Sequence, residues 1–513
     1  MEQLLGLAVF TWIAYMIIIY LGKSIFGISE NEERNLSRWF LKTLLSPFKY
    51  GVGELGGMYQ KEGFVSYFQK NTLIAKKYKG LLIDSQNDLR LSEDLSYQNC
   101  LIHATTGMGK TTKLLVPMIL DLAKNNKYNS QVILDPKMEI YQLTSGYLSK
   151  QGYKIIVLNP QDLNSSIGFN PLAFVKSDAD IESIMRNLLY SSSNSTNRGD
   201  SRFWDESSIH LLSIITKLLF SMRDATYVNL PNVRYLIQHF DSTPDNELDE
   251  LFIKYGDSDL IREYIRLKSY EDSVILSIIA TANMALSSIA TNNSLQRILA
   301  SDSFDFNQMR KEQIALYIQI PVQMASTYNF LVSSFINSMM QACLLKELPS
   351  KDDLGIYFLL DESGNFKIDL HRFITVSRGY KLSFTLVIQS TQQIYNLYGK
   401  DAAEVILNGG IGTKIFFGNA SNDLTNSISN MIGKKRVLVQ GKATLEPVLQ
   451  SSEIRTLKSD QVLVFIQNNK PFIQKVQPYY TQPKFNKLTK IPPYHATKKQ
   501  LVDYVDYLPM RSL

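Results

Sequence analysis

Short apolar runs alternate with amphipathic segments along most of this chain. Each run is short enough for a buried strand, and the segments between the runs have helical spacing. Strands that are separated by helices are joined by crossover connections, so the pattern predicts an α/β fold with a mainly parallel sheet covered by helices on both faces. The predicted strands are residues 100–102, 131–134, 154–158, 314–320, 355–360, 383–388, 413–417 and 461–466.

The middle of the chain has a different pattern. Between residues 178 and 300 helical periodicity continues with almost no strand signal; in Ser207–Phe220, for example, the apolar residues fall on one helical face. Val274–Ala290 is predicted to be another long helix. We therefore expect an all-α domain inserted into the α/β domain. The predicted bounds are 178–300 for the inserted domain, and 81–177 with 301–475 for the α/β domain.

An uncharged apolar run, Leu4–Leu21, lies near the N-terminus. As a helix it would span roughly 27 Å, enough to cross the hydrocarbon core of a bilayer. A secretory signal peptide would have a basic start and a small-x-small cleavage site, and this run has neither. Basic residues follow it, so the positive-inside rule places the rest of the chain in the cytoplasm. We predict a single-pass anchor in the cell membrane, residues 1–24, and a juxtamembrane segment, 25–80. Residues 39–58 fit an interfacial helix or a degraded second span.

The end of the chain is basic and aromatic. From Gln461 to Val502 there is no Asp or Glu, and there are seven lysines. Pro478, Pro483, Pro492 and Pro493 occur among Tyr479, Tyr480, Phe485 and Tyr494, which predicts an irregular Pro/Tyr/Lys-rich tail over residues 476–513. Such a tail fits either a solvated extension or an arm that contacts a partner or nucleic acid.

Composition narrows the function classes only a little. The formal net charge of +6 over 513 residues permits an anionic partner without requiring one. The two cysteines, Cys100 and Cys343, are far apart and have no metal-ligand spacing. This argues against a disulfide scaffold and against a zinc site, and it suits a reducing compartment.

The segment His103–Thr112, HATTGMGKTT, has the spacing of a phosphate-binding loop between a strand and a helix that would run from Lys110 to about Lys124. Glycines let backbone N–H groups surround phosphates, and the helix N-terminus adds partial positive charge. Lys110 would reach the β and γ phosphates, and the Thr111 hydroxyl would ligate Mg²⁺. Ala104 stands where the usual pattern has its first glycine, and a glycine-rich turn with an exposed lysine is the alternative. The predicted nucleotide-binding residues are Thr106, Gly107, Met108, Gly109, Lys110, Thr111 and Thr112.

Two acidic residues, Asp361 and Glu362, follow the apolar strand 355–360. At the carboxyl end of a parallel sheet they would face the phosphate loop. Because desolvating charge is costly, carboxylates at this position indicate a use for them. Asp361 would hold Mg²⁺ through water, and Glu362 would orient or deprotonate the attacking water. Taken alone, the pair also fits a strand that runs into a polar turn.

Polar residues after the acidic pair could complete a hydrolysis site. Gln389 ends the strand 383–388 and either senses the γ-phosphate or caps the next helix. Arg372 and Arg378 lie between the pair and Gln389; an arginine from a neighbouring subunit can neutralise transition-state charge, but both also fit surface ion pairs. His103 is expected to be structural. We predict hydrolysis of ATP with Lys110, Glu362, Gln389 and Arg378 as catalytic residues and Thr111 and Asp361 as metal ligands.

The order of these motifs resembles that of the TraG/TraD-type coupling proteins of type IV secretion. The resemblance covers about Asn99 to Phe485, and an alanine at the position of Ala104 is common in that family. The motifs that carry it are the phosphate loop, Leu134-Asp135-Pro136-Lys137, Gly152-Tyr153 with Val157-Leu158-Asn159-Pro160, Asn170-Pro171-Leu172, Phe203-Trp204-Asp205, Leu360-Asp361-Glu362, Ser377-Arg378-Gly379, Gln389-Ser390, Thr413–Gly418, and Val464-Phe465-Ile466 with Pro471.

The resemblance implies a membrane-anchored, RecA-like P-loop ATPase that uses ATP and Mg²⁺ and carries an inserted all-α domain. It implies a homo-hexamer that binds single- or double-stranded DNA irrespective of sequence, recruits a relaxase–DNA complex and passes it to the secretion channel. Arg378 falls where an inter-subunit arginine finger is expected, whereas Lys137 matches a motif to which we assign no role. Two alternatives are another DNA translocase, of the FtsK/HerA-like class, and a receptor that docks protein cargo with ATP as its switch.

Overall fold

The structure is a computed structural model. It describes residues 64–65, 67–192, 202–240, 246–301, 304–344, 347–439, 442–496 and 501–510. Contacts divide the chain into Met1–Phe68 and Gln69–Leu513, and the second unit contains the fold described below. The predicted anchor, Leu4–Leu21, and the apolar region 39–58 lie outside the described residues. Of the helices in the described part of the chain, none combines the length and the apolar character that a membrane span requires.

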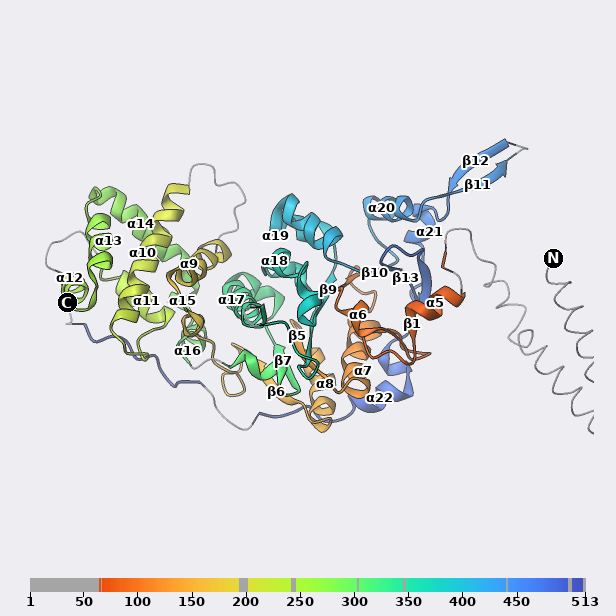
Figure 1. Cartoon of the computed structure of the whole chain (residues 1–513), viewed down its shortest axis with the longest axis horizontal. Coiled ribbons are helices and arrows are strands. Elements are labelled where there is room, and N and C mark those ends of the chain that lie inside the picture. The colour runs from red at the N-terminus through yellow and green to blue at the C-terminus, as the bar shows by residue number, and fades with distance from the viewer. Residues whose placement is uncertain are drawn as a thin grey trace, which may run out of the picture. The chain divides into compact units, whose positions relative to one another are not determined.

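A sheet forms the centre of the fold (Figure 1). It has nine strands in the order β14-β13-β10-β4-β9-β8-β5-β7-β6. The strands from β10 to β6 in this order are parallel, so the predicted mainly parallel sheet is confirmed. At the other edge β13 pairs antiparallel with β10, and β14 pairs antiparallel with β13. The strands are β4 (Cys100–His103), β5 (Asn129–Leu134), β6 (Lys154–Leu158), β7 (Ile314–Ile318), β8 (Gly355–Leu360), β9 (Leu382–Ile388), β10 (Thr413–Phe417), β13 (Gln461–Ile466) and β14 (Phe472–Lys475).

Helices cover both faces of this sheet, which is why its central strands are buried along their whole length. On β5, Val132 and Leu134 join the apolar core to which helix α17 (Ala325–Leu344) also contributes. Gln131, on the alternate face, donates a hydrogen bond from Nε2 to the carbonyl oxygen of Ile119, 3.3 Å away, in helix α7 (Val116–Asn125). Alternation along one strand thus assigns its side chains to two separate helical layers.

The segment between residues 178 and 300 is helical, and no strand occurs in its described residues. Its first helix packs against α17, which connects this block to the sheet. The segment predicted as one helix from Val274 to Ala290 is instead two, because Leu286 leaves helical geometry (φ −89°, ψ 0°) while staying buried. The helices are α9 (Asp178–Ser192), α10 (Arg202–Ser221), α11 (Leu230–Ile237), α12 (Glu247–Tyr255), α13 (Ser258–Lys268), α14 (Asp272–Ala285), α15 (Ser287–Thr291) and α16 (Asn293–Ala300). The domain boundaries stay a prediction.

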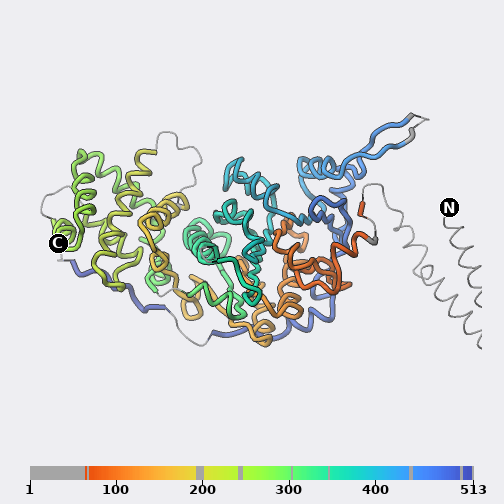
Figure 2. Tube along the Cα trace, in the orientation of Figure 1, coloured from red at the N-terminus to blue at the C-terminus, as the bar shows by residue number. Residues whose placement is uncertain are grey.

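The C-terminal tail was expected to be irregular, but it contains a helix, α22 (Pro483–Thr489), which packs against α8 (Glu139–Lys150). Farther along, the Tyr141 hydroxyl donates to the carbonyl oxygen of Tyr494 at 2.6 Å. A Cβ on Gly146 would lie 1.9 Å from the carbonyl oxygen of Pro492, so the close approach requires glycine there. Figure 2 shows that the last described residues of the tail lie beside the helical block. There the Leu508 N–H donates to Asn232 Oδ1 at 2.8 Å. It therefore binds two distant parts of its own chain.

The remaining described elements are not part of the central sheet. A small antiparallel sheet has the order β1-β3-β2, and β11 and β12 form a separate hairpin. These elements are α5 (Tyr67–Leu73), β1 (Ile74–Ala75), β2 (Leu82–Asp84), β3 (Leu89–Leu91), α6 (Glu93–Ser96), α18 (Leu370–Phe373), α19 (Thr391–Glu404), α20 (Asn422–Ile432), β11 (Lys434–Val439), β12 (Lys442–Pro447) and α21 (Ser451–Arg455).

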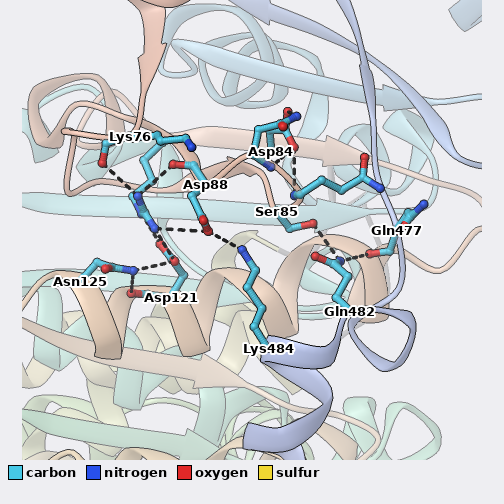
Figure 3. A network of polar contacts seen from close by, with 12 residues as sticks. Lys76, Asp84, Ser85, Asp88, Asp121, Asn125, Gln477, Gln482 and Lys484 are labelled. Carbon is cyan, nitrogen blue, oxygen red and sulfur yellow. Dashed lines mark hydrogen bonds and ion pairs between the residues drawn. The ribbon is translucent and has the colours of Figure 1, made fainter. Parts of the chain in front are cut away.

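A polar network ties the small sheet to α7 and to the tail (Figure 3). Arg90 of β3 forms a two-pronged contact with Asp121 of α7, with Nε 2.6 Å from Oδ2 and Nη2 2.8 Å from Oδ1. Both side chains are buried. Lys484 of α22 pairs with Asp88, which lies next to β3. The helix that follows the phosphate loop continues into α7. The contacts of Asp121 therefore fix the position of the helix to which the loop is joined.

We predict that Arg90→Met destabilises the fold by about 3 kcal/mol or more, because it leaves the carboxylate of Asp121 buried without its cation. The measurement is the free energy of unfolding from urea titration. Arg262→Met is the matched control, since Arg262 pairs with Asp259 and both side chains are 75% exposed. That loss should stay below about 1 kcal/mol. Equal losses for the two variants would contradict the role given to Arg90.

Candidate functional site

The carboxyl ends of four neighbouring strands, β4, β9, β8 and β5, bring most of the predicted site residues together. The register aligns His103 of β4 with Ile388 of β9, and Leu360 of β8 with Leu134 of β5. The phosphate loop, Gln389, the acidic pair and Asp135 thus follow adjacent strand ends. The strand that carries Gln389 lies between the strand of the loop and the strand of the acids.

The phosphate loop has the backbone that its glycines predict. Gly107 and Gly109 have φ angles of 85° and 77°, in the left-handed region that favours glycine. Lys113, in the helical turn after the loop, links the loop to the segment before β13. Its Nζ donates to the carbonyl oxygens of Met108 and Ser459, both at 2.8 Å. The helix predicted after the loop is present, and its first turn, Thr111–Leu115, is π-helical before α7 begins.

Lys110 is a buried cation without a hydrogen-bond acceptor among the described residues. Its side chain is 7% exposed, and its Nζ lies 3.8 Å from Asp361 Oδ1 and 3.6 Å from Glu362 Oε1. These distances allow charge pairing but are too long for good hydrogen bonds. Three unused N–H donors in a buried position favour an anionic ligand, because an unsatisfied buried ammonium group is costly.

The acidic pair is buried beside Lys110 and the loop. Asp361 Oδ2 accepts a hydrogen bond from the Thr111 hydroxyl at 2.8 Å, so the two predicted metal ligands are in contact. Burial raises the pKa of Asp361, and the charge of Lys110 and the Thr111 hydrogen bond oppose that rise. Glu362 has left-handed backbone angles (φ 52°, ψ 36°), which are unusual for a residue with a side chain. Within the described residues no group of three or more His, Cys, Asp and Glu could hold a metal by itself.

Gln389 connects the loop to the acidic pair. Its Oε1 accepts from the Thr106 hydroxyl at 3.0 Å, and its Nε2 donates to Glu362 Oε1 at 3.3 Å. It does not cap the next helix, which was the alternative: the cap of α19 is Ser390, in a capping box with Gln393. The amide oxygen of Gln389 therefore faces the phosphate loop, and its amide nitrogen faces the acidic pair.

The two arginines lie elsewhere. Arg378 is exposed in the turn Ser377–Tyr380, which precedes β9, whereas Gln389 follows the strand. The seven residues of β9 separate its ends by about 20 Å. Arg378 lines a surface pocket with Asn99 and Gln467, at the amino end of β9. Arg372, in α18, is also exposed. Arg378 lies at the amino end of β9, whereas the phosphate loop lies at the carboxyl end. Arg378 therefore cannot reach the phosphate loop of its own chain.

One residue that sequence reasoning left without a role lies in the site. Lys137 extends its Nζ to 3.2 Å from Glu362 Oε1. Partial burial is the largest single influence on the pKa of Lys137 and lowers it. The hydrogen bond and the charge of Glu362, together with the charges of Asp361 and Glu139, outweigh burial, so the pKa is raised. Asp135 is buried at the end of β5, where Oδ2 accepts from the Tyr141 N–H at 2.8 Å, and burial raises its pKa to about 6. The Asp-Pro-Lys motif was a signal, but locating its target required the pairing of β5 with β8.

His103 is buried at the end of β4 beneath the loop. Burial lowers its pKa to about 4, and the nearby charge of Lys110 acts in the same direction. Its ring lies 6.3 Å from that of Phe416, centroid to centroid. A neutral, packed ring is consistent with the structural role expected for it.

Comparison with protein families and curated proteins gives consistent matches. The family model for Type IV secretory system Conjugative DNA transfer matches residues 66–503. Conjugal transfer protein TraG of Rhizobium radiobacter is 22% identical over 403 residues, which cover 72% of this chain and 60% of TraG. The chain thus spans about 60% of the length of this curated relative.

Solved structures of the plasmid coupling protein TrwB share the fold. TrwB in complex with the non-hydrolysable GTP analogue GDPNP has a TM-score of 0.64 at 16% identity, covering 80% of this chain and 92% of TrwB. TrwB in complex with ADP and Mg²⁺ has a TM-score of 0.62 at 16% identity, covering 81% and 93%. The likeness and the mainly parallel sheet identify an α/β, RecA-like fold.

We predict that the His103→Asn variant loses less stability than the wild type between pH 7 and pH 5. The pKa of this histidine falls from 6.5 to about 4 on folding, so the neutral form is favoured in the fold. The associated stability is fully present above pH 6.5 and is lost as the pH falls towards 4, with about 2 kcal/mol lost by pH 5. Urea titration at both pH values measures this difference. An identical loss in both proteins would contradict it.

Proposed function

Because the chain belongs to the family of type IV secretory system conjugative DNA transfer proteins, we propose that it is a coupling ATPase. In this proposal it is anchored in the cell membrane with its ATPase domain in the cytoplasm. It links a relaxase–DNA complex to the secretion channel and drives DNA transfer by hydrolysing ATP. The observation that carries the ATPase assignment is the buried ammonium group of Lys110, which has two carboxylates beside it and no hydrogen-bond acceptor among the described residues.

The residues present fit a nucleoside triphosphate with Mg²⁺. Lys110 offers unused donors, and there is open space around the Cα of Gly107, where a Cβ would meet nothing within 4 Å. The Thr111 hydroxyl and the Asp361 carboxylate would hold Mg²⁺, which prefers oxygen ligands and keeps several waters. Bound there, Mg²⁺ would neutralise charge on the phosphates. TrwB has been solved with ADP and Mg²⁺ and with the ATP analogue ADPNP, which supports the choice of ligand.

Hydrolysis requires this chain's side chains to change partners. Lys110 would leave the acidic pair for the β and γ phosphate oxygens, which releases one cation from Glu362. Glu362 would then orient a water molecule and accept its proton, while the water oxygen bonds to the γ-phosphorus and the bond to the bridging oxygen breaks. Gln389, which contacts both Thr106 and Glu362, would sense the presence of the γ-phosphate.

Arg378 is proposed to act on the site of a neighbouring subunit. It lies at the amino end of β9, too far from the phosphate loop of its own chain. In a homo-hexamer, the proposed assembly, this edge of one subunit would face the loop of the next, and the guanidinium would neutralise transition-state charge. Arg378→Ala should then abolish turnover while nucleotide still binds, and inactive subunits should poison mixed oligomers. Activity that falls only in proportion to the fraction of mutant chains would contradict action in trans.

DNA is the proposed substrate of the motor, and the phosphate backbone is the proposed point of contact. Binding irrespective of sequence rests on backbone charge, so it should weaken steeply with salt. The family assignment supports DNA, the relaxase–DNA complex and the secretion channel as partners. Nucleotide turnover is what separates this function from that of a cargo receptor that uses ATP only as a switch.

We predict that two substitutions in the full-length protein have different effects on nucleotide binding and on turnover. Lys110→Ala should weaken ATP binding and abolish turnover, because the buried cation faces the phosphates. Glu362→Gln should keep ATP affinity within about threefold and lower turnover by at least about 100-fold, because it removes the proton acceptor. Binding is measured with a fluorescent, non-hydrolysable ATP analogue, and turnover by phosphate release. Retained turnover in Glu362→Gln would show that another group activates the water.

A further inference from the structure

A lysine outside the phosphate loop contacts the carboxylate that is proposed to activate water. Lys137 Nζ is 3.2 Å from Glu362 Oε1, closer than Lys110 Nζ, which is 3.6 Å away. The Glu362 side chain is 6% exposed, and the Lys137 side chain is 54% exposed. The ammonium group of this half-exposed lysine therefore lies beside a buried carboxylate.

The backbone around Lys137 is held in a fixed turn. The Asp135 N–H donates to the carbonyl oxygen of Ile318 at 2.9 Å, and the Met138 N–H donates back to the carbonyl oxygen of Asp135 at 3.1 Å. Pro136 restricts the chain between them. Met138 has left-handed angles (φ 58°, ψ 11°), which cost a residue with a side chain roughly 1 kcal/mol or more. This turn directs Lys137 from the end of β5 towards the end of the adjacent β8.

The charges of the site give this contact a function. With the protein free of nucleotide, Glu362 has two cations, Lys110 and Lys137, and the amide of Gln389 around the same oxygen. Once Lys110 turns to the phosphates, Lys137 is the cation that stays beside Glu362. Without Lys137, the buried Glu362 carboxylate would have no side-chain cation of its own, and it would compete with the phosphates for Lys110.

We propose that Lys137 is a positioning residue for hydrolysis: it holds the Glu362 carboxylate in place while Lys110 binds the phosphates. This rests on the proposed ATPase function. Because Lys137 opens the turn into α8, and α8 packs against the C-terminal tail, the same contact links the position of Glu362 to that helix. Lys137 acts through Glu362 and does not itself contact the reacting atoms.

The first test is independent of hydrolysis. Thermal unfolding midpoints of the full-length, nucleotide-free protein are measured for wild type, Lys137→Met, Glu362→Gln and the double variant. We expect Lys137→Met to lower the midpoint when Glu362 is present. In the Glu362→Gln background, where the carboxylate is gone, the same substitution should have little further effect. Additive shifts would overturn the proposed pairing. Lys150→Met, which removes an exposed charge at the end of α8, is the control and should change nothing.

The second test measures turnover and nucleotide affinity in the same variants. Lys137→Met should lower kcat by roughly 10- to 100-fold and leave the affinity for the fluorescent, non-hydrolysable analogue within about threefold. Lys137→Arg should restore most of the rate, since it keeps a cation in reach of Glu362. A kcat in Lys137→Met equal to that of the control would overturn the role. If the wild type itself hydrolyses no ATP, the proposed function fails, whereas the unfolding experiment still decides whether Lys137 and Glu362 are coupled.

Discussion

A buried ammonium group between two buried carboxylates is the interaction on which this structure depends. Lys110, Asp361 and Glu362 are each 7% exposed or less, and burying any one of them alone would be prohibitive. Together they are tolerable, because each charge has an opposite charge within 4 Å. The balance is incomplete, however, since Lys110 keeps unused hydrogen-bond donors. A site of this kind is stable enough to fold and is still available to a phosphate.

The rest of the fold maintains that arrangement. The order of the sheet places the strand of Gln389 between the strand of the loop and the strand of the acids. The buried contact between Arg90 and Asp121 fixes the helix that follows the loop. The tail then packs on α8, the helix that Lys137 precedes, and continues to the helical block. Packed elements, as well as the chain itself, thus connect the site to the helical block.

Local patterns predicted the strands and the loop, because apolar runs and glycine spacing are properties of contiguous residues. Lys110, Thr111 and the acidic pair were identifiable on that basis. The lateral order of parallel strands is not encoded locally, so the contact of Lys137 with Glu362 had no sequence signal beyond an unexplained motif. The helix in the tail and the packing partners of the tail could not be predicted, for the same reason. Its prolines and tyrosines indicated an irregular segment, but its partners, Tyr141, Gly146 and Asn232, are hundreds of residues away.

In the proposed function, this buried charge cluster hydrolyses ATP to move DNA. The most direct measurement is the steady-state ATP turnover of the full-length protein with and without DNA over a range of salt concentrations. We expect single- or double-stranded DNA of any sequence to raise turnover, and we expect this stimulation to decrease as salt weakens contact with the phosphate backbone. Tight nucleotide binding without turnover, under every DNA and salt condition, would contradict it.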